Sequence, residues 1–379
     1  MGAFDVIVVG LGAMGSSAAY HLAKRDAKVL GLEAFSPAHD KGSSHGESRI
    51  IRQAYFEHPA YLPLVLRAYQ LWEEVEAESG QSLLNITGGL GIGSPKGELI
   101  AGCLKSAKMH GLNYDLLDAS AMKRRFPQFV LAENEMAFYE EKAGYLKPEE
   151  CIRQHLNCAS RRGAVLHFNE PILSWTASES GESVTVVTGQ DTYHAQSLVM
   201  AAGPWTGQLV AGLPISLTVS RRVMFWLNPV SQSASFDQSV FPIFIWQPDE
   251  REIFYGFPRT HEDGAPKVAI HSGLEECTPA TIDRNIRLSD VAAIRSAIRS
   301  RIPALNGEVS HAATCMYTMT EDQHFVIDIH PRHPQVSIAA GFSGHGFKFS
   351  SLVGEILCDL VLTRKTSSDI VLFSISRNG

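Results

Sequence analysis

The chain of 379 residues contains little that would place it in a membrane, a secreted disulfide scaffold or a nucleic-acid complex. No apolar run approaches the roughly 18 residues that a membrane span needs. The six cysteines form no C-x-x-C pair and lie near no histidines at zinc-finger spacing, so neither a disulfide framework nor a metal site is predicted. Lys and Arg number 33 against 40 Asp and Glu, a formal net charge of −7, and no basic block suggests nucleic acid as a partner.

The bulk composition is that of a globular protein. Hydrophobic residues make up 45% and charged residues 19% of the chain, and its length suffices for two domains or one interleaved domain. The sequence shows no secretory signal, prenylation box or peroxisomal tail. We therefore expect no membrane association and a location in the cytoplasm.

The N-terminal segment carries a dinucleotide-binding pattern. An apolar run over residues 4–9 precedes Gly10, Gly12 and Gly15, in G-x-G-x-x-G spacing, and a helix is expected over residues 13–24. The first glycine permits a tight turn, the second lets the backbone approach a pyrophosphate, and the third lets helix and strand pack closely. The helix N-terminus would direct unpaired N–H groups at the phosphates.

An acidic residue completes this pattern. Glu33 follows a second apolar run that ends at residue 32, roughly 20 residues beyond the glycines. Its carboxylate can accept hydrogen bonds from ribose hydroxyls and would repel a 2′-phosphate, so NADP is not expected. The motif does not separate FAD from NAD.

The remaining elements predict an interleaved α/β protein. Helices are expected over residues 59–78, 96–110, 148–162, 289–301 and 351–363, strands over 84–95, 164–168, 183–187, 192–202, 324–329 and 336–340, a long polar loop over 36–58, and antiparallel strands over 215–275. We predict a discontinuous dinucleotide-binding domain from residues 1–83, 148–214 and 318–379. A substrate domain on a mixed or antiparallel sheet would use residues 84–147 and 215–317.

Two charged clusters could bind anions. The segment GFSGHGFKFS over residues 341–350 places Gly344, Gly346 and Lys348 before a helix, where they could stabilise a reduced flavin or merely form a turn. Arg49 and Arg52 would share one face of a helical turn but point to opposite faces of an extended segment. They suit a carboxylate or phosphate, or form a surface pair.

Two further positions stay open on pattern alone. Lys267 and His271 are an even number of residues apart, so both can face one side of a strand that lies near Tyr255. A lysine within an apolar strand is either functional or protects an edge strand. Cys315, outside any disulfide or metal pattern, is by itself typical of a core thiol.

Long segments identify a family resemblance. FDVIVVGLGAMG near the start, GSSHGESRIIRQAY at 42–55, YLPLVLRA at 61–68, YGFP at 255–258, CMYTMTEDQHFVIDIHP at 315–331 and AAGFSGHGFKFSS at 339–351 resemble the monomeric sarcosine oxidase and N-methyltryptophan oxidase family, and are closer to sarcosine oxidase. The similarity covers essentially the whole chain. It implies an FAD-binding Rossmann-like domain interleaved with the substrate domain, as in glutathione-reductase-like amine oxidases, and a monomer.

The resemblance also implies a covalent flavin and its contacts. FAD would be attached through its 8α-methyl group to the sulfur of Cys315. The implied FAD-binding residues are Gly10, Gly12, Ala13, Met14, Gly15, Glu33, Ala34, Gly42, Ser43, Arg49, Ile172, Cys315, Met316, Gly344, His345, Gly346, Phe347 and Lys348.

The implied reaction is the oxidation of a secondary amino acid by O2. The imine product would hydrolyse, for sarcosine to glycine and formaldehyde, and hydrogen peroxide would form. Arg52 and Lys348 would bind the substrate carboxylate, together with Gly344, while Tyr255 and His271 would line the pocket. The implied catalytic residues are Lys267, the site of oxygen activation, Arg49, His271, Tyr255 and His45.

Several positions depart from the family pattern and leave the substrate open. Ser44, Glu47 and Ser48 replace the usual histidine, aspartate and threonine, and Ile245 stands where a methionine is usual. A larger N-methyl amino acid or a cyclic imino acid such as pipecolate or proline therefore remains an alternative to sarcosine. A second alternative is a flavin dehydrogenase that passes electrons to an acceptor other than O2. A third is a non-catalytic FAD-binding subunit, although such a protein would not need Arg52, Lys267, His271 and Lys348 together.

Overall fold

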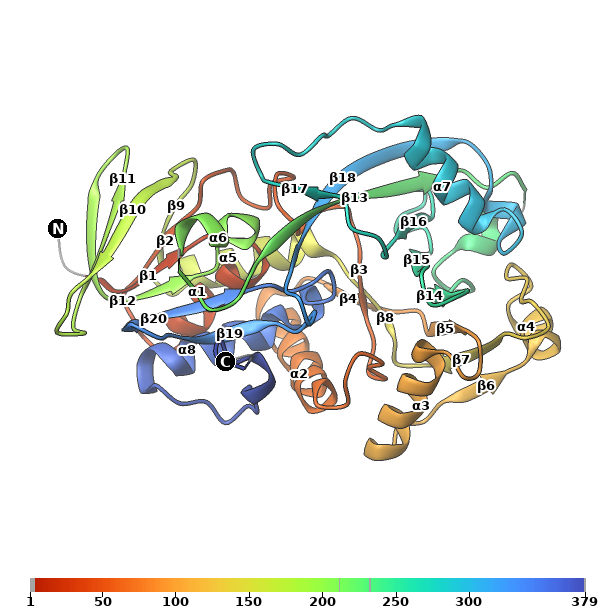
Figure 1. Ribbon diagram of the computed structural model, residues 1–379, viewed down its shortest axis with the longest axis horizontal. Coiled ribbons are helices and arrows are strands. Elements are labelled where there is room, and N and C mark those ends of the chain that lie inside the picture. The colour runs from red at the N-terminus through yellow and green to blue at the C-terminus, as the bar shows by residue number, and fades with distance from the viewer. Residues whose placement is uncertain (1–3, 211, 232, 378–379) are drawn as a thin grey trace.

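The computed structural model describes residues 4–210, 212–231 and 233–377. The predicted first domain was drawn to include residues 1–3, 211 and 378–379, and the second to include residue 232; these positions lie outside the described residues. Among those that are described, the strands form two large sheets at opposite ends of the long axis and one small sheet between them (Figure 1).

The first sheet is mostly parallel. Its eight strands are β1 (Phe4–Val9), β2 (Val29–Leu32), β9 (Val165–His167), β10 (Ile172–Ala177), β11 (Val184–Thr188), β12 (Thr192–Met200), β19 (Val326–His330) and β20 (His333–Ala340). β1 pairs in parallel with both β2 and β12, β2 with β9, and β12 with β20, while β10, β11 and β19 add antiparallel pairs. Segments from both ends and the middle of the chain therefore meet in one sheet.

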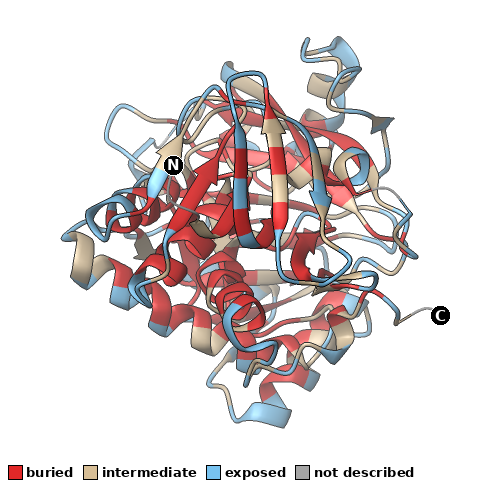
Figure 2. Cartoon of the chain, turned by 90° about the vertical axis from the view of Figure 1, so that its left-hand side faces the viewer, coloured by how far each residue is buried: buried red, intermediate tan, exposed pale blue. Residues whose placement is uncertain are grey.

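Four helices pack against this sheet in one apolar core. They are α1 (Ala13–Lys24), α2 (Tyr61–Ser79), α5 (Pro148–Arg161) and α8 (Ser350–Thr363). The small side chains of the first part of α1 let it lie close to β1 and contact both α5 and α8. Figure 2 shows buried residues along the strands and inner helix faces, with exposed residues on loops and outer surfaces.

The second sheet has nine strands, and the small sheet has three. The second contains β5 (Gly89–Gly93), β6 (Asp115–Leu117), β7 (Met136–Glu140), β13 (Thr218–Leu227), β14 (Ile243–Gln247), β15 (Phe254–Phe257), β16 (Lys267–Ile270), β17 (Glu276–Cys277) and β18 (Val309–Met319). The small sheet contains β3 (Arg49–Ile51), β4 (Leu84–Ile86) and β8 (Gly144–Leu146). The remaining helices are α3 (Glu98–His110), α4 (Ala119–Arg125), α6 (Thr206–Leu209) and α7 (Leu288–Ile298), beside short 3₁₀ turns.

The predicted α/β fold class is confirmed, but several element predictions are wrong. The region 36–58 is not entirely loop, because it contains β3. Residues 84–95 are not one strand: Gly88, with φ of +73°, separates β4 from β5, which belong to different sheets. β14 pairs antiparallel with β15 but parallel with β5, so the second sheet is mixed. The domain boundaries stay a prediction.

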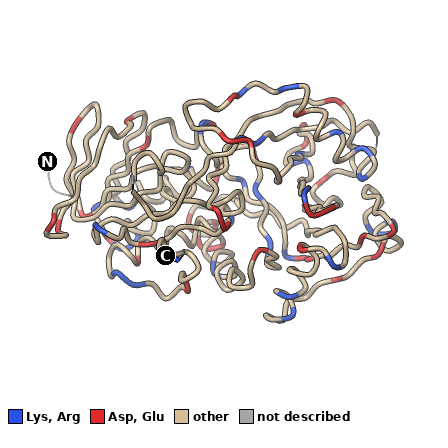
Figure 3. The backbone as a smooth tube through the Cα atoms, viewed as in Figure 1, with Lys and Arg blue, Asp and Glu red and all other residues tan. Residues whose placement is uncertain are grey.

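Neither charged residues nor long apolar helices mark out one end of the described structure. Basic and acidic residues are distributed over both ends of the molecule (Figure 3). None of the helices in the described part of the chain is long and apolar enough to cross a membrane.

Candidate active site

The larger of two adjoining cavities lies at the carboxyl ends of β1 and β2. Its volume is about 450 Å³, within the range of pockets for cofactors and other small molecules. Of the residues predicted to bind FAD, its walls include Gly10, Gly12, Ala13, Met14, Glu33, Ala34, Gly42, Ser43, Arg49, Ile172, Met316, Gly344, Gly346 and Phe347.

The three motif glycines have distinct surroundings. Gly10 has φ of +83°, which accommodates the tight turn after β1. A Cβ on Gly15 would lie 1.7 Å from the Gly10 carbonyl oxygen, so only glycine permits this approach of α1. A Cβ on Gly12 would meet no described heavy atom within 4 Å, and Gly12 lines the cavity. The predicted turn and close packing are confirmed, and the backbone at Gly12 is open to a ligand.

Glu33 is fixed at the end of β2. Its Oε2 accepts a hydrogen bond from the Leu11 N–H at 2.7 Å and its Oε1 one from the Phe35 N–H at 3.1 Å. His39 Nε2 lies 3.3 Å from Oε1. These contacts hold a buried carboxylate in the cavity wall, where the motif predicts an acceptor for ribose hydroxyls.

Cys315 lies behind this wall, not in it. The Cys315 side chain is buried on β18, and its Sγ lies 3.6 Å from the Ser43 carbonyl oxygen and 3.9 Å from Arg49 Nη2. Ser43, Arg49 and the following residue, Met316, all line the larger cavity. The thiol is thus adjacent to the cavity, in contact with a guanidinium.

The second, smaller cavity has a volume of about 70 Å³ and adjoins the first. Arg49, Tyr317, Gly344 and Phe347 line both cavities. The predicted substrate residues Arg52, Tyr255, His271, Gly344 and Lys348 all lie in its wall, together with His345 and Ile245. Of all predicted site residues, only Gly15, His45, Lys267 and Cys315 line neither cavity.

Two buried cations meet at the smaller cavity. Arg52 Nη2 donates to both Glu57 carboxylate oxygens, at 2.8 and 2.7 Å, and its guanidinium lies over the Tyr55 ring. Lys348 Nζ donates to the His345 carbonyl oxygen at 2.6 Å and to the Tyr55 hydroxyl at 3.4 Å. Burial lowers the pKa of Lys348 to about 7, Arg52 lowers it too, and Glu57 opposes the shift. The two cations favour an anionic ligand.

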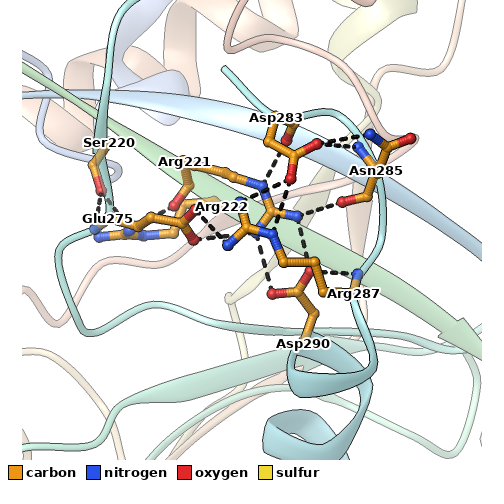
Figure 4. Close-up of polar contacts among 8 residues, drawn as sticks. All are labelled: Ser220, Arg221, Arg222, Glu275, Asp283, Asn285, Arg287 and Asp290. Carbon is orange, nitrogen blue, oxygen red and sulfur yellow. Dashed lines mark hydrogen bonds and ion pairs between the residues drawn. The ribbon is translucent and has the colours of Figure 1, made fainter. Parts of the chain in front are cut away.

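Three polar rings, those of Tyr255, His271 and Tyr317, also line the smaller cavity. The Tyr317 hydroxyl lies 3.4 Å from both the Tyr255 hydroxyl and His271 Nδ1. Burial, then Arg222, lowers the pKa of His271 to about 4, so its ring is neutral at pH 7. Arg222 stacks on the Tyr317 ring, 4.8 Å from its centroid, and donates to the Gly273 carbonyl oxygen. It also donates to the Ser220 hydroxyl oxygen (Figure 4).

Lys267 is buried behind Arg49. β16 pairs on one side with β13 and on the other with β15, so the alternative of a lysine protecting an edge strand is wrong. Lys267 Nζ donates to the Gly46 and Ser48 carbonyl oxygens, each at 2.6 Å. Arg49 and Arg52 are not an exposed surface pair either, because Arg52 is buried and Arg49 is half-buried.

Comparison with known proteins places this site in a family. Residues 5–360 match the family model described as FAD dependent oxidoreductase. The chain is 47% identical to monomeric sarcosine oxidase of Streptomyces avermitilis, over 99% of this chain and 97% of that protein. It belongs to the monomeric sarcosine oxidase and N-methyltryptophan oxidase family of FAD-dependent oxidoreductases.

A second relative agrees with this assignment, and a solved structure shares the fold. N-methyl-L-tryptophan oxidase of Salmonella arizonae is 33% identical over 99% of both chains. The open form of NikD, described as an unusual amino acid oxidase, has the same fold, with a TM-score of 0.85 at 22% identity over 99% of this chain and 98% of that one. The family resemblance expected from the sequence is confirmed, and the protein is a flavin-dependent amine oxidase.

Sequence reasoning missed several wall residues of the smaller cavity. Glu57 and Tyr317 face the predicted cations and rings, but neither belongs to a spacing that indicates a site. Tyr317 stands two residues after Cys315, so their side chains share one face of β18, but the sequence did not predict that strand. No local signal identifies Glu57, whose partner Arg52 precedes it in an irregular segment.

Proposed function

We propose that this enzyme oxidises sarcosine, or another small N-methyl amino acid, using O2 and FAD attached covalently to Cys315. The substrate loses one hydrogen from carbon and one from nitrogen, in total two electrons and two protons, and becomes an imine. Water converts this imine into the primary amino acid and formaldehyde, and O2 takes up the electrons and protons as hydrogen peroxide.

The observation that carries the proposal is that two buried cations, Arg52 and Lys348, lie in the wall of the smaller cavity, which adjoins the larger one. A substrate carboxylate would bind Lys348 and would replace the Glu57 carboxylate as the hydrogen-bond acceptor of Arg52. Its amine would then meet neutral His271 and the hydroxyls of Tyr255 and Tyr317, which exchange hydrogen bonds without adding charge. These contacts would orient the C–H bond toward the residues that both cavities share.

The larger cavity has the chemistry that FAD requires. Glu33 would accept the ribose hydroxyls, and Gly12 with the N-terminus of α1 would meet the pyrophosphate. When bound, FAD accepts the two electrons from the amine and passes them to O2.

Charged residues near this cavity would support that chemistry. Arg49 lines both cavities, and its positive charge would stabilise a negative charge that develops between them. Lys267, held behind Arg49 by two carbonyl groups, would stabilise superoxide-like negative charge during oxygen reduction. His45, Arg49, Tyr255, Lys267 and His271 are thus the proposed catalytic residues.

The size of the smaller cavity favours sarcosine over a bulkier amine. At about 70 Å³ it has room for roughly five water-sized groups. Ile245 forms part of its wall and, together with Arg52, also lines a third cavity of about 20 Å³ beyond it. Proline, pipecolate and a bulkier N-methyl amino acid are therefore proposed as poorer substrates than sarcosine.

A precipitation test and a peroxide screen examine this proposal together. Acid precipitation of the purified enzyme is expected to leave the yellow colour in the pellet, whereas Cys315→Ser should release it to the supernatant. Cys277→Ser, which removes a half-buried thiol, is the control and should keep the colour. Sarcosine, larger N-methyl amino acids, proline and pipecolate are then screened for hydrogen peroxide under air.

Each failure has its own meaning. Release of all flavin from the unaltered enzyme contradicts the Cys315 linkage. Bleaching of the flavin by sarcosine without peroxide favours a dehydrogenase, and faster turnover of pipecolate favours the cyclic substrate. A monomeric state and a cytoplasmic location are part of the proposal, and size-exclusion chromatography with light scattering tests the former.

A further inference from the structure

Glu149 anchors an unusual turn next to the proposed active site. It lies in the first turn of α5, and its Oε1 accepts the Gly46 N–H at 2.5 Å. The Glu47 N–H lies 3.2 Å from both Glu149 oxygens. Gly46 has φ of +97° and Glu47 of +66°, so both occupy the left-handed region, which costs a residue other than glycine about 1 kcal/mol or more. The carboxylate offsets this cost by binding both N–H groups.

The same turn holds Lys267 and Arg49. The carbonyl oxygens on either side of Glu47, those of Gly46 and Ser48, are the two acceptors of Lys267 Nζ. Arg49 Nη1 donates to the Ser48 carbonyl oxygen at 2.8 Å. Glu149 accepts the N–H groups of this turn, and both carbonyl acceptors of Lys267 belong to the same turn. The carboxylate is therefore tied to the position of Lys267, whereas Arg49 has a further acceptor, the Ser43 carbonyl oxygen, outside the turn.

Glu149 also supplies compensating charge. Lys267 is only 1% exposed and forms no ion pair with any described residue. Burial lowers its pKa well below the usual value, Arg49 lowers it further, and the carboxylates of Glu149 and then Glu47 oppose the shift. Burial and then Arg49 likewise lower the pKa of His45 to about 4, and Glu149 again opposes.

We propose that Glu149 is a positioning residue for the oxidative half of the reaction, acting through the turn at residues 46–48 and through its charge to hold Lys267 in place as a cation. This inference rests on the proposed function, in which Lys267 assists the transfer of two electrons and two protons to O2. Glu149 itself lines neither cavity, so its effect would reach the substrate and cofactor only through other residues.

Three variants separate the effect of the Glu149 charge, the effect of its hydrogen bonds and the effect of altering any glutamate in this helix turn. Glu149→Gln removes the charge and keeps a hydrogen-bond acceptor, and Glu149→Ala removes both. The matched control is Glu150→Gln, at the next position of the same helix turn, where the carboxylate contacts only Gln154 and Arg153 in the described chain. If the alanine variant fails to fold, Glu149→Asp, with its shorter side chain, replaces it.

The first readout separates the two half-reactions. Flavin reduction by sarcosine is followed without O2, and reoxidation is followed after reduction by dithionite, which needs no substrate. Glu149→Gln is expected to slow reoxidation about tenfold, below the 10²–10³ typical of a direct electrostatic contact. Reduction by sarcosine should change less than about threefold, because Arg49, which lines the smaller cavity, also donates to the Ser43 carbonyl oxygen outside the turn.

The second readout does not depend on activity. Hydrogen–deuterium exchange of the peptide that contains residues 42–50 should be faster in Glu149→Ala than in the unaltered enzyme and in Glu150→Gln, because the Gly46 and Glu47 amides lose their acceptor. Unchanged exchange in this peptide, unchanged reoxidation in both Glu149 variants, or equal slowing of both half-reactions would overturn the inference. Failure of sarcosine to reduce the unaltered enzyme would instead overturn the proposed function alone.

Discussion

At the scale of single residues, Lys348 makes substrate binding depend on pH. Its pKa is lowered to about 7, so the ammonium group is mostly charged below pH 7 and mostly neutral above it. Around it lie Arg52, Glu57, Tyr55 and His345. As pH rises through 7, Lys348 loses the charge that would attract a carboxylate, whereas Arg52 keeps its own.

We therefore expect the KM for sarcosine to rise between pH 6 and pH 8 from this titration. Lys348→Met should raise KM about tenfold at pH 6, the loss expected for one charge-assisted hydrogen bond, and should remove the part of the pH dependence that Lys348 causes. Lys365→Met, an exposed position, is the control. The same pH profile in Lys348→Met and the unaltered enzyme would contradict the assignment.

Sequence could predict the residues whose roles depend on local spacing. Gly10, Gly15 and Glu33 follow from one strand–turn–helix–strand pattern, and the structure gives the two glycines the predicted surroundings. Glu149 could not be predicted, because its hydrogen bonds join residues more than a hundred positions apart. The predicted carboxylate-binding pair, Arg52 and Lys348, came from the resemblance, since spacing alone left open whether Arg49 and Arg52 bind an anion or form a surface pair.

At the scale of elements, a buried arginine ties β13 to the loop before α7. Arg221 Nη2 donates to Asp290 Oδ2 at 2.8 Å and to the Asn285 carbonyl oxygen at 2.7 Å, and its Nε donates to the Asp283 carbonyl oxygen at 2.7 Å (Figure 4). Its side chain is only 1% exposed. The neighbouring residue Arg222 stacks on Tyr317, so this network also supports the smaller cavity.

Loss of Arg221 should destabilise the second sheet. Arg221→Met leaves the partly buried Asp290 carboxylate with less compensation, and we expect it to lower the free energy of unfolding by about 3 kcal/mol. Arg287→Met, at an arginine whose side chain is 43% exposed, should lower the free energy of unfolding much less, because exposed ion pairs contribute little to stability. Urea denaturation followed by circular dichroism and by flavin fluorescence measures both, and equal midpoints for the two variants would contradict the argument.

The elements that sequence missed have identifiable reasons. β18 was not predicted, because Val309–Met319 mixes small and polar residues that do not alternate clearly in hydropathy. Its partner β13 holds it along its whole length, so pairing and not intrinsic preference makes this strand. The helices with clear apolar faces, such as α2, were predicted within a few residues of their observed bounds.

At the scale of the whole molecule, the larger cavity draws its wall from distant parts of the chain. Gly12 and Glu33 come from near the N-terminus, Ile172 and Trp205 from the middle, and Phe347 from near the C-terminus. A ligand bound there contacts only the folded chain, so it stabilises the fold by mass action.

Covalent attachment should therefore change how stability depends on free FAD. The Tm of Cys315→Ser is expected to rise with added FAD, by the equivalent of about 2.7 kcal/mol at a hundred times the dissociation constant. The Tm of the unaltered enzyme and of Cys277→Ser should not change, because their cofactor is already attached. A Tm of Cys315→Ser that is independent of FAD would contradict noncovalent binding in this cavity.

The interleaved order of the first sheet has a consequence for biosynthesis. β12 pairs with β1 on one side and with β20 on the other, and β20 is synthesised more than a hundred residues after β12. During translation β12 must therefore wait with an unpartnered edge for a strand not yet synthesised. Because residues 339–344 and Phe347 complete the wall of the larger cavity, FAD can be enclosed there only after that segment has been synthesised.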